Sequence, residues 1–434
     1  MITRIEVDGY RLLNNFAADL RSLNVVIGAN ATGKSTLLDC LKFIAECTEV
    51  SLDTASNLHW GTVSLLTAGK QDNKVAWRIT VQKPKTDVWD FLPLKRDSPL
   101  VYEAVLQTDI SGRVRPQYEV LRNPSPAPGH IDPFKFLEAT PYHRVILDKT
   151  KKLVSFDESQ PSVDVVQEEN SAGEVDMSGD PNSCRPTPQD AALLLSQIRF
   201  FNEFPVPSAV RLLLASMRFY PGFEVTRFSA LRTRSAEIKP ETTLTPTGNN
   251  LGTVLHELLT RYDYKATAED LLDFLHVAYP DFVAIHCDTT YGAPPQVLVR
   301  VRERGMPRSM EIYELSDGML RFLCLATALL NPWAPPLIAV DEPELGLHPR
   351  LLPIVADLIK AAAERTQVLV TTHSPDLVNC FGIEDIAVMA RHADRPEVVW
   401  HRPADHKTLV TMLKDVSGQT LGDLHRSGEL ETGA

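Results

Sequence analysis

The stretch Gly28-Ala29-Asn30-Ala31-Thr32-Gly33-Lys34-Ser35 decides the fold of this 434-residue chain. It has the form G-x-x-x-x-G-K-[S/T] and lies between an apolar, β-branched run at Leu23–Ile27 and a helical pattern at Thr36–Ile44. In that setting the motif predicts a loop whose backbone N–H groups wrap a phosphate, because glycines leave room for the anion. We expect Lys34 to reach the β- and γ-phosphates of a nucleotide and Ser35 to ligate Mg²⁺.

A second motif lies about 300 residues downstream, at Leu337–Glu342. An apolar strand that ends in two carboxylates places both acids at the carboxyl edge of a sheet, where ligands bind in open α/β folds. On its own this is equally a solvated pair of acids at a strand end, and the upstream loop favours the functional interpretation. We then expect Asp341 to hold Mg²⁺ and Glu342 to orient and deprotonate an attacking water.

The remaining patterns predict an α/β chain of the P-loop type, with a mixed sheet, an antiparallel subdomain and a mainly helical insertion. Strand patterns between turns predict the antiparallel sheet at Val75–Val81, Val101–Thr108, Gln117–Leu121 and His143–Leu147. Helical patterns occupy Ala191–Phe201, Pro207–Met217, Leu251–Tyr262 and Ala268–Val277. We expect one ATPase head built from lobes 1–155 and 301–434, interrupted by an insertion at 156–300.

Composition sets further bounds on the protein. The formal charge is −12, which at first disfavours a nucleic-acid partner. Eight acidic residues and no Lys or Arg lie in Phe156–Cys184, which is expected to be a solvated excursion, and removing them leaves −4. Six scattered cysteines argue against a zinc site or a disulfide framework and fit a reducing cytosol. No signal peptide or membrane span is predicted, so we expect a cytoplasmic protein.

Three more motifs surround the second one: Leu315–Met319 before an apolar helix, Glu344–Pro349 after the carboxylates, and His373 at the end of the next strand. Together with the two phosphate motifs they resemble the ATP-binding-cassette (ABC) ATPases. The resemblance is strongest to the RecF/SMC-like branch, which includes bacterial predicted ATPases described as AAA family and RecF-like. It covers roughly residues 1–45 and 310–380 well, and the rest more loosely.

The resemblance implies an ATPase with ATP and Mg²⁺ as cofactors, working as a head-to-tail dimer with two ATP molecules between the protomers. The loop residues implied to bind nucleotide are Gly28, Ala29, Asn30, Ala31, Thr32, Gly33, Lys34, Ser35 and Thr36. Ser316 and Gly318 would touch the γ-phosphate of the partner's ATP, and His373 would sense the γ-phosphate in cis. Catalysis would rest on Glu342, Lys34 and His373.

Two departures from the family pattern stand out. Asp317 occupies a place where many cassettes have a second glycine, and we expect its carboxylate to point away from the phosphate. Ser316 by itself predicts a helix N-cap, which is compatible with the phosphate role. The glutamine that usually couples the γ-phosphate to an insertion is not identifiable, although Gln71 and His59 lie in roughly the right region.

The biological role stays open between alternatives. One is DNA maintenance or repair by a dimer that clamps DNA; another is a nucleotide-gated scaffold with little turnover that sequesters an effector nuclease or toxin, as in phage defence. A transporter motor is disfavoured, and about 60 residues after His373 leave no room for a Toprim nuclease domain. Two basic clusters either face phosphates or are solvated charges. The first contains Arg227, Arg232, Arg234 and Lys239. The second contains Arg300, Arg302, Arg304 and Arg308, and its solvated alternative is an edge strand that carries charges. Tyr220, Phe223 and Phe228 either stack on bases or pack in the core.

Overall fold

The computed structural model describes most of the chain. The residues outside the description are 68–69, 71, 110–111, 128–129, 142, 148, 151, 156–191, 199–200, 233–235, 238–241, 291–293, 393–396, 407–419 and 431–434. The predicted acidic excursion at Phe156–Cys184 therefore lies outside the described residues, as do Gln71, Arg234 and Lys239. Among the residues that are described, no helix combines the length and apolarity needed to cross a bilayer.

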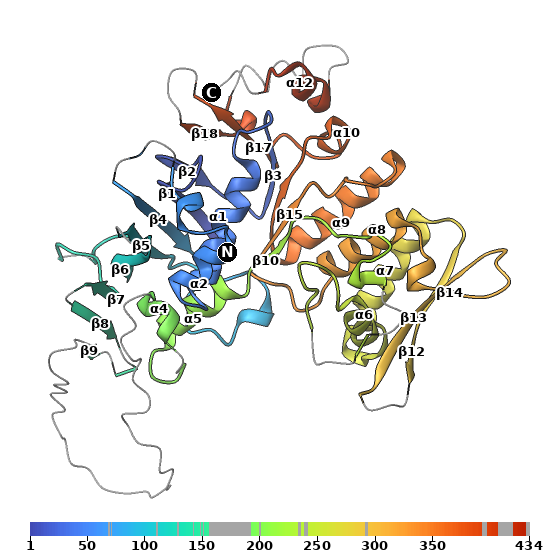
Figure 1. The fold of residues 1–434 in the computed structure, drawn as a ribbon, viewed down its shortest axis with the longest axis horizontal. Helices are drawn as coiled ribbons and strands as arrows, with labels where there is room; N and C mark the ends of the chain where they lie inside the picture. Colours follow the sequence, from blue (N-terminus) through green and yellow to red (C-terminus); the bar gives the residue numbers. More distant parts are fainter. Residues whose placement is uncertain are drawn as a thin grey trace, which may run out of the picture.

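A six-stranded sheet forms the centre of the molecule, in the order β10-β15-β16-β3-β17-β18 (Figure 1). Its first five strands are parallel and β18 is antiparallel to β17. The bounds are β3 (Leu23–Ile27), β10 (Arg218–Tyr220), β15 (Leu337–Asp341), β16 (Gln367–Thr371), β17 (Ile386–Arg391) and β18 (Val398–His401). Strand β3, from the N-terminal end of the chain, thus lies between β16 and β17, from the C-terminal third, and the sheet confirms the predicted α/β fold.

An eight-stranded antiparallel sheet lies beside it, in the order β2-β1-β4-β5-β6-β7-β8-β9. Its bounds are β1 (Ile2–Asp8), β2 (Phe16–Asp19), β4 (Lys74–Val81), β5 (Leu100–Thr108), β6 (Val114–Arg122), β7 (Lys135–Thr140), β8 (His143–Leu147) and β9 (Leu153–Ser155). The sheet confirms the antiparallel subdomain, and β2, β7 and β9 are additions to the predicted strands. A third sheet contains β11 (Ala236–Glu237), β12 (Phe282–Thr290), β13 (Gln296–Glu303) and β14 (Met310–Glu311).

Helices cover both faces of the central sheet (Figure 1). One face and the neighbouring antiparallel sheet carry α1 (Lys34–Cys47), α2 (Leu52–Leu58), α3 (Thr62–Leu65), α4 (Leu194–Gln197) and α5 (Pro205–Ala215). The other face carries α6 (Leu251–Thr260), α7 (Lys265–Ala278), α8 (Asp317–Leu329) and α9 (Leu352–Arg365), and near the C-terminus lie α10 (Pro375–Val378) and α12 (Leu421–Ser427). Among the described residues of the predicted helix 191–201, α4 forms a single turn.

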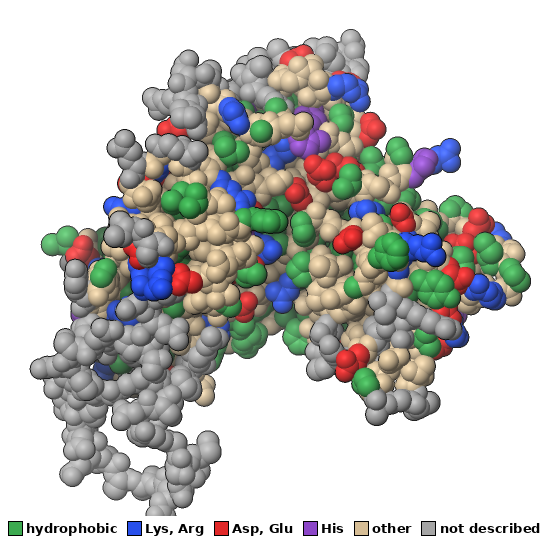
Figure 2. Space-filling model, viewed as in Figure 1, with side chains coloured by type: hydrophobic (Ala, Val, Ile, Leu, Met, Phe, Trp, Pro, Cys, Tyr) green, Lys and Arg blue, Asp and Glu red, His purple; other side chains and the backbone are tan. Residues whose placement is uncertain are grey.

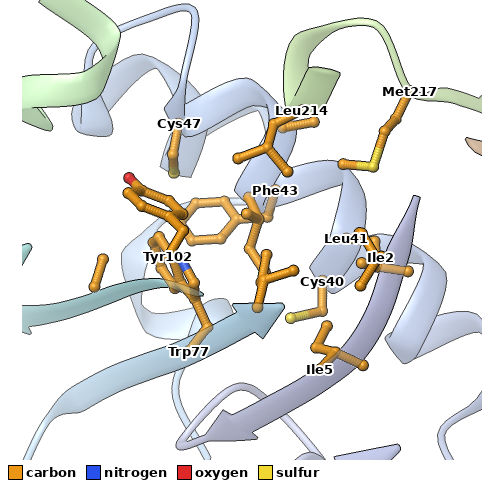
Figure 3. Close-up of a cluster of buried hydrophobic side chains, with 14 of the residues drawn as sticks. Ile2, Ile5, Cys40, Leu41, Phe43, Cys47, Trp77, Tyr102, Leu214 and Met217 are labelled. Carbon is orange, nitrogen blue, oxygen red and sulfur yellow. The ribbon is translucent and has the colours of Figure 1, made fainter. Parts of the chain in front are cut away.

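Two hydrophobic cores share the central sheet, because successive side chains of a strand point to opposite faces. In β3, Val26 belongs to the first core, whereas Val25 and Ile27 belong to the second. Figure 3 shows the first core, where Leu41 and Phe43 of α1 meet side chains from β1, β4, β5 and the α5 region. Helix α1, which starts at the phosphate-binding motif, is therefore held between two sheets.

The predicted insertion contains helices α4, α5, α6 and α7, and strands β10, β11, β12 and most of β13 also fall within 156–300. The insertion contributes to the central sheet, because β10 pairs in parallel with β15, with Arg218 opposite Ile338 and Tyr220 opposite Val340. Only three residues form β10, which is too short for a periodic pattern to reveal it.

Candidate nucleotide-binding site

Three neighbouring parallel strands bring the motifs of the site to one edge of the sheet. The order is β15-β16-β3, with Asp341 opposite Thr371 and Thr371 opposite Val26. The glycine-rich loop follows β3, the two acids end β15, and His373 comes just after β16. Since the carboxyl ends of parallel strands share an edge, motifs almost 350 residues apart in sequence meet there.

The glycine-rich loop is tightly held against β17. Gly28 has a φ of 151°, and a Cβ there would lie 2.1 Å from the backbone oxygen of Met389. Gly33 has a φ of 97° and caps the N-terminus of α1. Lys34 is only 5% exposed, and its Nζ donates to the backbone oxygens of Gly28 at 2.6 Å and Ala29 at 2.9 Å. The lysine ammonium thus lies over the loop that the sequence predicts to bind phosphate.

Part of the loop is open to solvent, although Thr32 is buried. Asn30 and Ser35 are exposed and Thr36 is half-buried. The loop shape is fixed by two side-chain bonds: Thr32 Oγ1 donates to the Ala29 oxygen at 2.9 Å, and Arg391 donates to the Ala31 oxygen through Nε at 3.1 Å and Nη2 at 3.0 Å. Arg391 comes from β17, and no motif in the sequence points to this contact.

The two acids after β15 differ in their backbone. Asp341 is still in the strand, and its Oδ1 accepts a hydrogen bond from Thr371 Oγ1 on β16. Glu342 has a φ of 48°, a left-handed conformation that costs a residue other than glycine about 1–2 kcal/mol. Its N–H donates to the Thr371 oxygen at 2.9 Å, and its Oε1 lies 3.9 Å from Nε2 of His373. The turn therefore directs the second carboxylate towards the histidine.

Glu344 fixes the loop that carries the histidine, a role that the sequence analysis missed. Its Oε1 accepts from Thr372 Oγ1 at 2.6 Å and from the His373 N–H at 3.3 Å. Burial raises the pKa of this carboxyl group, and its hydrogen bonds to Thr372 and to the backbone only partly counter that effect. Glu344 thus joins the turn after β15 to the turn after β16.

The signature segment lies at the start of α8. Ser316 Oγ accepts from the Met319 N–H at 3.2 Å, which confirms the predicted N-cap. The Asp317 carboxylate forms an ion pair with Arg232, whose Nη1 also donates to the backbone oxygens of Tyr313 at 3.0 Å and Leu315 at 2.8 Å. Arg232 belongs to the predicted basic cluster, but here it is only 10% exposed in its side chain and binds the signature segment.

The other side of this segment contacts the turn after β15. A Cβ on Gly318 would lie 3.5 Å from the backbone oxygen of Gly346. Ser316 and Asp317 are exposed, and β16 separates their neighbour β15 from β3 and the glycine-rich loop. The signature segment and the glycine-rich loop therefore stand two strands apart along the same edge.

His59 is not available as a ligand for the γ-phosphate. Its side chain is 2% exposed, and its two ring nitrogens bond Asp39 Oδ1 at 2.9 Å and Glu46 Oε2 at 2.7 Å. Burial lowers the pKa of this imidazole, but the bonds to Asp39 and Glu46 outweigh burial and the net shift is upward. His59 ties α1 to α2, and Gln71 lies outside the described residues.

Most of the basic and aromatic side chains that were candidates for nucleic-acid contact are paired or buried within the protein. β13 is not an edge strand, since it lies between β12 and β11, and Arg300 Nη1 donates to Asp288 Oδ2 of β12 at 2.7 Å. The edge-strand interpretation of this arginine stripe is therefore wrong. Tyr220 and Phe223 are buried in the second core, whereas Phe228 is 95% exposed.

Comparison with known proteins agrees with this architecture. A family model described as "AAA ATPase domain" matches residues 1–85, and one described as "AAA domain, putative AbiEii toxin, Type IV TA system" matches residues 226–379. No curated protein matches.

Several solved structures of Smc heads are similar to this chain. A head bound to the C-winged helix domain of ScpA has a TM-score of 0.51 at 12% identity, with 93% of this chain and 99% of that one covered. An SMC head domain from Thermotoga maritima has a TM-score of 0.41 at 9% identity, covering 92% and 98%. A head with an extended coiled coil, bound to a ScpA domain derived from Pyrococcus furiosus, has a TM-score of 0.48 at 11% identity, covering 95% and 99%.

The chain has the α/β fold of P-loop ATPase domains of the ABC type. The first of these likenesses shows that the chain has the fold of an Smc head. The two family models together span most of both lobes of that head. In sequence the chain is similar to ATPase domains over residues 1–85 and 226–379, and in fold it is similar to an Smc head.

Proposed function

We propose that the chain hydrolyses ATP at a site shared between two copies of itself, arranged head to tail. The observation that carries this proposal is the edge of the central sheet. There the glycine-rich loop, Asp341-Glu342 and His373 follow three adjacent strands, while the exposed signature segment stands two strands away. A second copy, rotated to face the first, would bring its Ser316 and Gly318 to the γ-phosphate.

The chemistry of this site would be an in-line attack of water on the γ-phosphate of ATP. Glu342 would accept the proton of the water, and Lys34 would leave the loop carbonyls to neutralise the phosphate oxygens. His373 would hydrogen-bond the γ-phosphate from the side of Glu342. Backbone N–H groups of the loop and the N-terminus of α1 would bind the β-phosphate.

Magnesium fits the donors present at this edge. Ser35 offers an exposed hydroxyl and Asp341 a carboxylate, which are the hard oxygen ligands that Mg²⁺ prefers. No group of three or more His, Cys, Asp or Glu side chains that could hold a metal occurs in the described part of the chain. Two protein ligands suit an ion that is shared with nucleotide phosphates. Bound there, Mg²⁺ would neutralise charge on the β- and γ-phosphates.

Glu342→Gln tests both the activity and the assembly. The amide keeps the size of the side chain but cannot accept the proton, so this variant should bind ATP, lose turnover by roughly a hundredfold or more, and accumulate as a closed dimer. Size-exclusion chromatography with light scattering and a phosphate-release assay would measure this. Lys34→Ala is the matched control. This variant lacks the ammonium group that would neutralise the phosphate oxygens, so it should stay monomeric. A Glu342→Gln protein that remains monomeric at saturating ATP would contradict the dimer.

The output of the cycle is proposed to be control of an effector nuclease or toxin. A family model that matches 226–379 is described in terms of a toxin–antitoxin system, which supports this choice over DNA clamping. The arginines that could face phosphates also weigh against DNA, because Arg232 and Arg300 are engaged by Asp317 and Asp288. A gel-shift assay with the Glu342→Gln dimer separates the two: tight, salt-sensitive binding of duplex DNA only in the presence of ATP would favour the clamp.

A further inference from the structure

The segment 420–430 folds over the turn that follows β16. Helix α12 lies beside α10, and Figure 2 shows histidine and acidic side chains next to each other in this region. The segment is anchored by apolar burial, because Leu424 is 1% and Leu430 0% exposed within the second core. Thr420 and Asp423 form a reciprocal capping box that sets the start of α12.

Gly422 makes this docking specific. Its N–H donates to Asn379 Oδ1 at 2.6 Å, just beyond the end of α10. A Cβ on Gly422 would lie 2.4 Å from the backbone oxygen of Pro375, a distance that a larger residue could reach only by displacing the helix. The position of α12 is thus determined by the turn that begins at His373.

This docking places His425 at the nucleotide site. Its ring lies close enough to His373 and Lys34 for both to affect its ionisation. Burial, followed by the charges of His373 and Lys34, lowers the pKa of His425. Glu342 Oε1 lies 3.9 Å from His373 Nε2, and Arg426 of α12 lies 4.0 Å from Asp376 of α10.

We propose that the segment 420–430 is a cis element of the nucleotide site, in which His425 is a positioning residue that holds the His373 backbone against the γ-phosphate of ATP. The inference rests on the proposed function. The ligand class that couples to the segment is a nucleoside triphosphate with Mg²⁺. ADP lacks the γ-phosphate that His373 would bind. ATP therefore strengthens the docking of α12, and ADP does not.

Substitution of His425 tests the positioning role. His425→Ala should lower kcat roughly tenfold while ADP affinity stays within about twofold, since the diphosphate contacts come from the loop after β3. His425→Gln keeps an N–H donor at similar reach and should recover most of kcat. Ser427→Ala, an exposed neighbour on the same helix, is the matched control and should behave as the unmodified protein. Equal kcat for His425→Ala and Ser427→Ala would overturn the inference.

Hydrogen exchange tests the coupling independently of turnover. In the Glu342→Gln protein, amides 422–430 should exchange at least about tenfold more slowly with Mg-ATP than with Mg-ADP. Gly422→Ala should remove that difference because α12 can no longer dock, and thermal unfolding of this variant checks that the rest of the head is folded. If ATP closes the dimer but protects these amides no better than ADP, the inference fails while the proposed function stands. If no ATP binds at all, the proposed function fails first.

Discussion

Single residues at the sheet edge carry backbone conformations that most side chains avoid. Glu342 is left-handed at a φ of 48°, and Gly28 and Gly33 also have positive φ values. At Glu342 the strain is compensated by the N–H bond to Thr371, so the surrounding sheet dictates where the carboxylate points. The direction of the Glu342 carboxylate is thus set by the backbone before any ligand arrives.

The two loop glycines should differ sharply when they are replaced. Gly28→Ala brings a Cβ to 2.1 Å from the Met389 oxygen and should cost about 3 kcal/mol or more of stability, together with ATP binding. At Gly33 the nearest atom to an added Cβ is at 3.5 Å, so Gly33→Ala should cost only the backbone strain, about 1–2 kcal/mol. Urea unfolding and ATP titration measure both. Equal losses for the two variants would mean that the contact with Met389 has no effect.

Glu344 should act through hydrogen bonding rather than through charge. Glu344→Gln keeps an acceptor for Thr372 and the His373 N–H and should retain kcat within about threefold, whereas Glu344→Ala should lower kcat roughly tenfold. Steady-state ATPase kinetics would show the difference. A Gln variant as impaired as the Ala variant would indicate that the negative charge itself is required.

At the scale of elements, Arg232 joins the residues before α6 to the start of α8. The ion pair itself contributes little, since Asp317 is 70% exposed, but the bonds to the oxygens of Tyr313 and Leu315 fix the signature segment. A nearby position on the same stretch, Arg227, is exposed. Substituting each arginine in turn therefore distinguishes the loss of contacts to the signature segment from a general loss of positive charge.

Arg232→Ala should leave ATP affinity of the monomer within about twofold and reduce ATP-dependent dimerisation and kcat roughly tenfold, because in the proposed dimer the signature segment would serve the partner's site. Arg227→Ala is the charge-matched control and should change neither. Fluorescent-nucleotide titration and light scattering give the two readouts. Loss of nucleotide affinity in the Arg232→Ala monomer would place the residue in the cis site instead.

A buried carboxyl joins α4 to the antiparallel sheet. Glu119 of β6 accepts from the N–H groups of Leu194 at 2.5 Å and Leu195 at 3.0 Å and from the Tyr102 hydroxyl at 2.9 Å. Burial raises the pKa of Glu119 from 4.5 to about 7, against the smaller opposing effect of these bonds. The folded state therefore holds a proton that the unfolded state has already released near neutral pH.

The sign of the resulting pH dependence follows from that shift. The stabilisation by the Glu119 proton is fully present below pH 4.5 and is lost as the pH rises through about 7, a change of roughly 3 kcal/mol. Glu119→Gln cannot titrate, so the stability difference between the parent and this variant should fall across that window. Urea unfolding at pH 5, 6, 7 and 8 checks it. A difference that does not change with pH would show that Glu119 stays ionised in the folded state.

The sequence predicted the elements that have strong local patterns. The apolar runs of β3, β15 and β16, the helix after the glycine-rich loop and the Ser316 cap all follow from neighbouring residues. β10, the Arg391 bond to the loop and the docking of α12 could not be predicted, because each depends on partners more than 40 residues away in the chain. The place of α12 depends on the contacts of Gly422 with Pro375 and Asn379.

For the whole molecule, the central sheet makes the two cores one cooperative unit. Val25 faces the second core and Leu41 of α1 the first, both fully buried. Val25→Ala and Leu41→Ala should each cost about 2–4 kcal/mol and lower the temperature of one common transition. Differential scanning calorimetry of the parent and both variants measures this. Two separable transitions, each sensitive to one variant, would mean that the cores unfold independently.

The position of β3 in the sheet also governs how the protein is made. All five residues of β3 are buried, and its neighbours β16 and β17 lie more than 330 residues later in the chain. At about 5–20 residues per second, a ribosome delivers those neighbours roughly 20–70 s after β3 itself. Throughout that interval the apolar strand has unpaired edges, a template for aggregation that a chaperone would need to shield. An unfinished chain also cannot form the nucleotide pocket, so ATP binding reports that translation has run through β17.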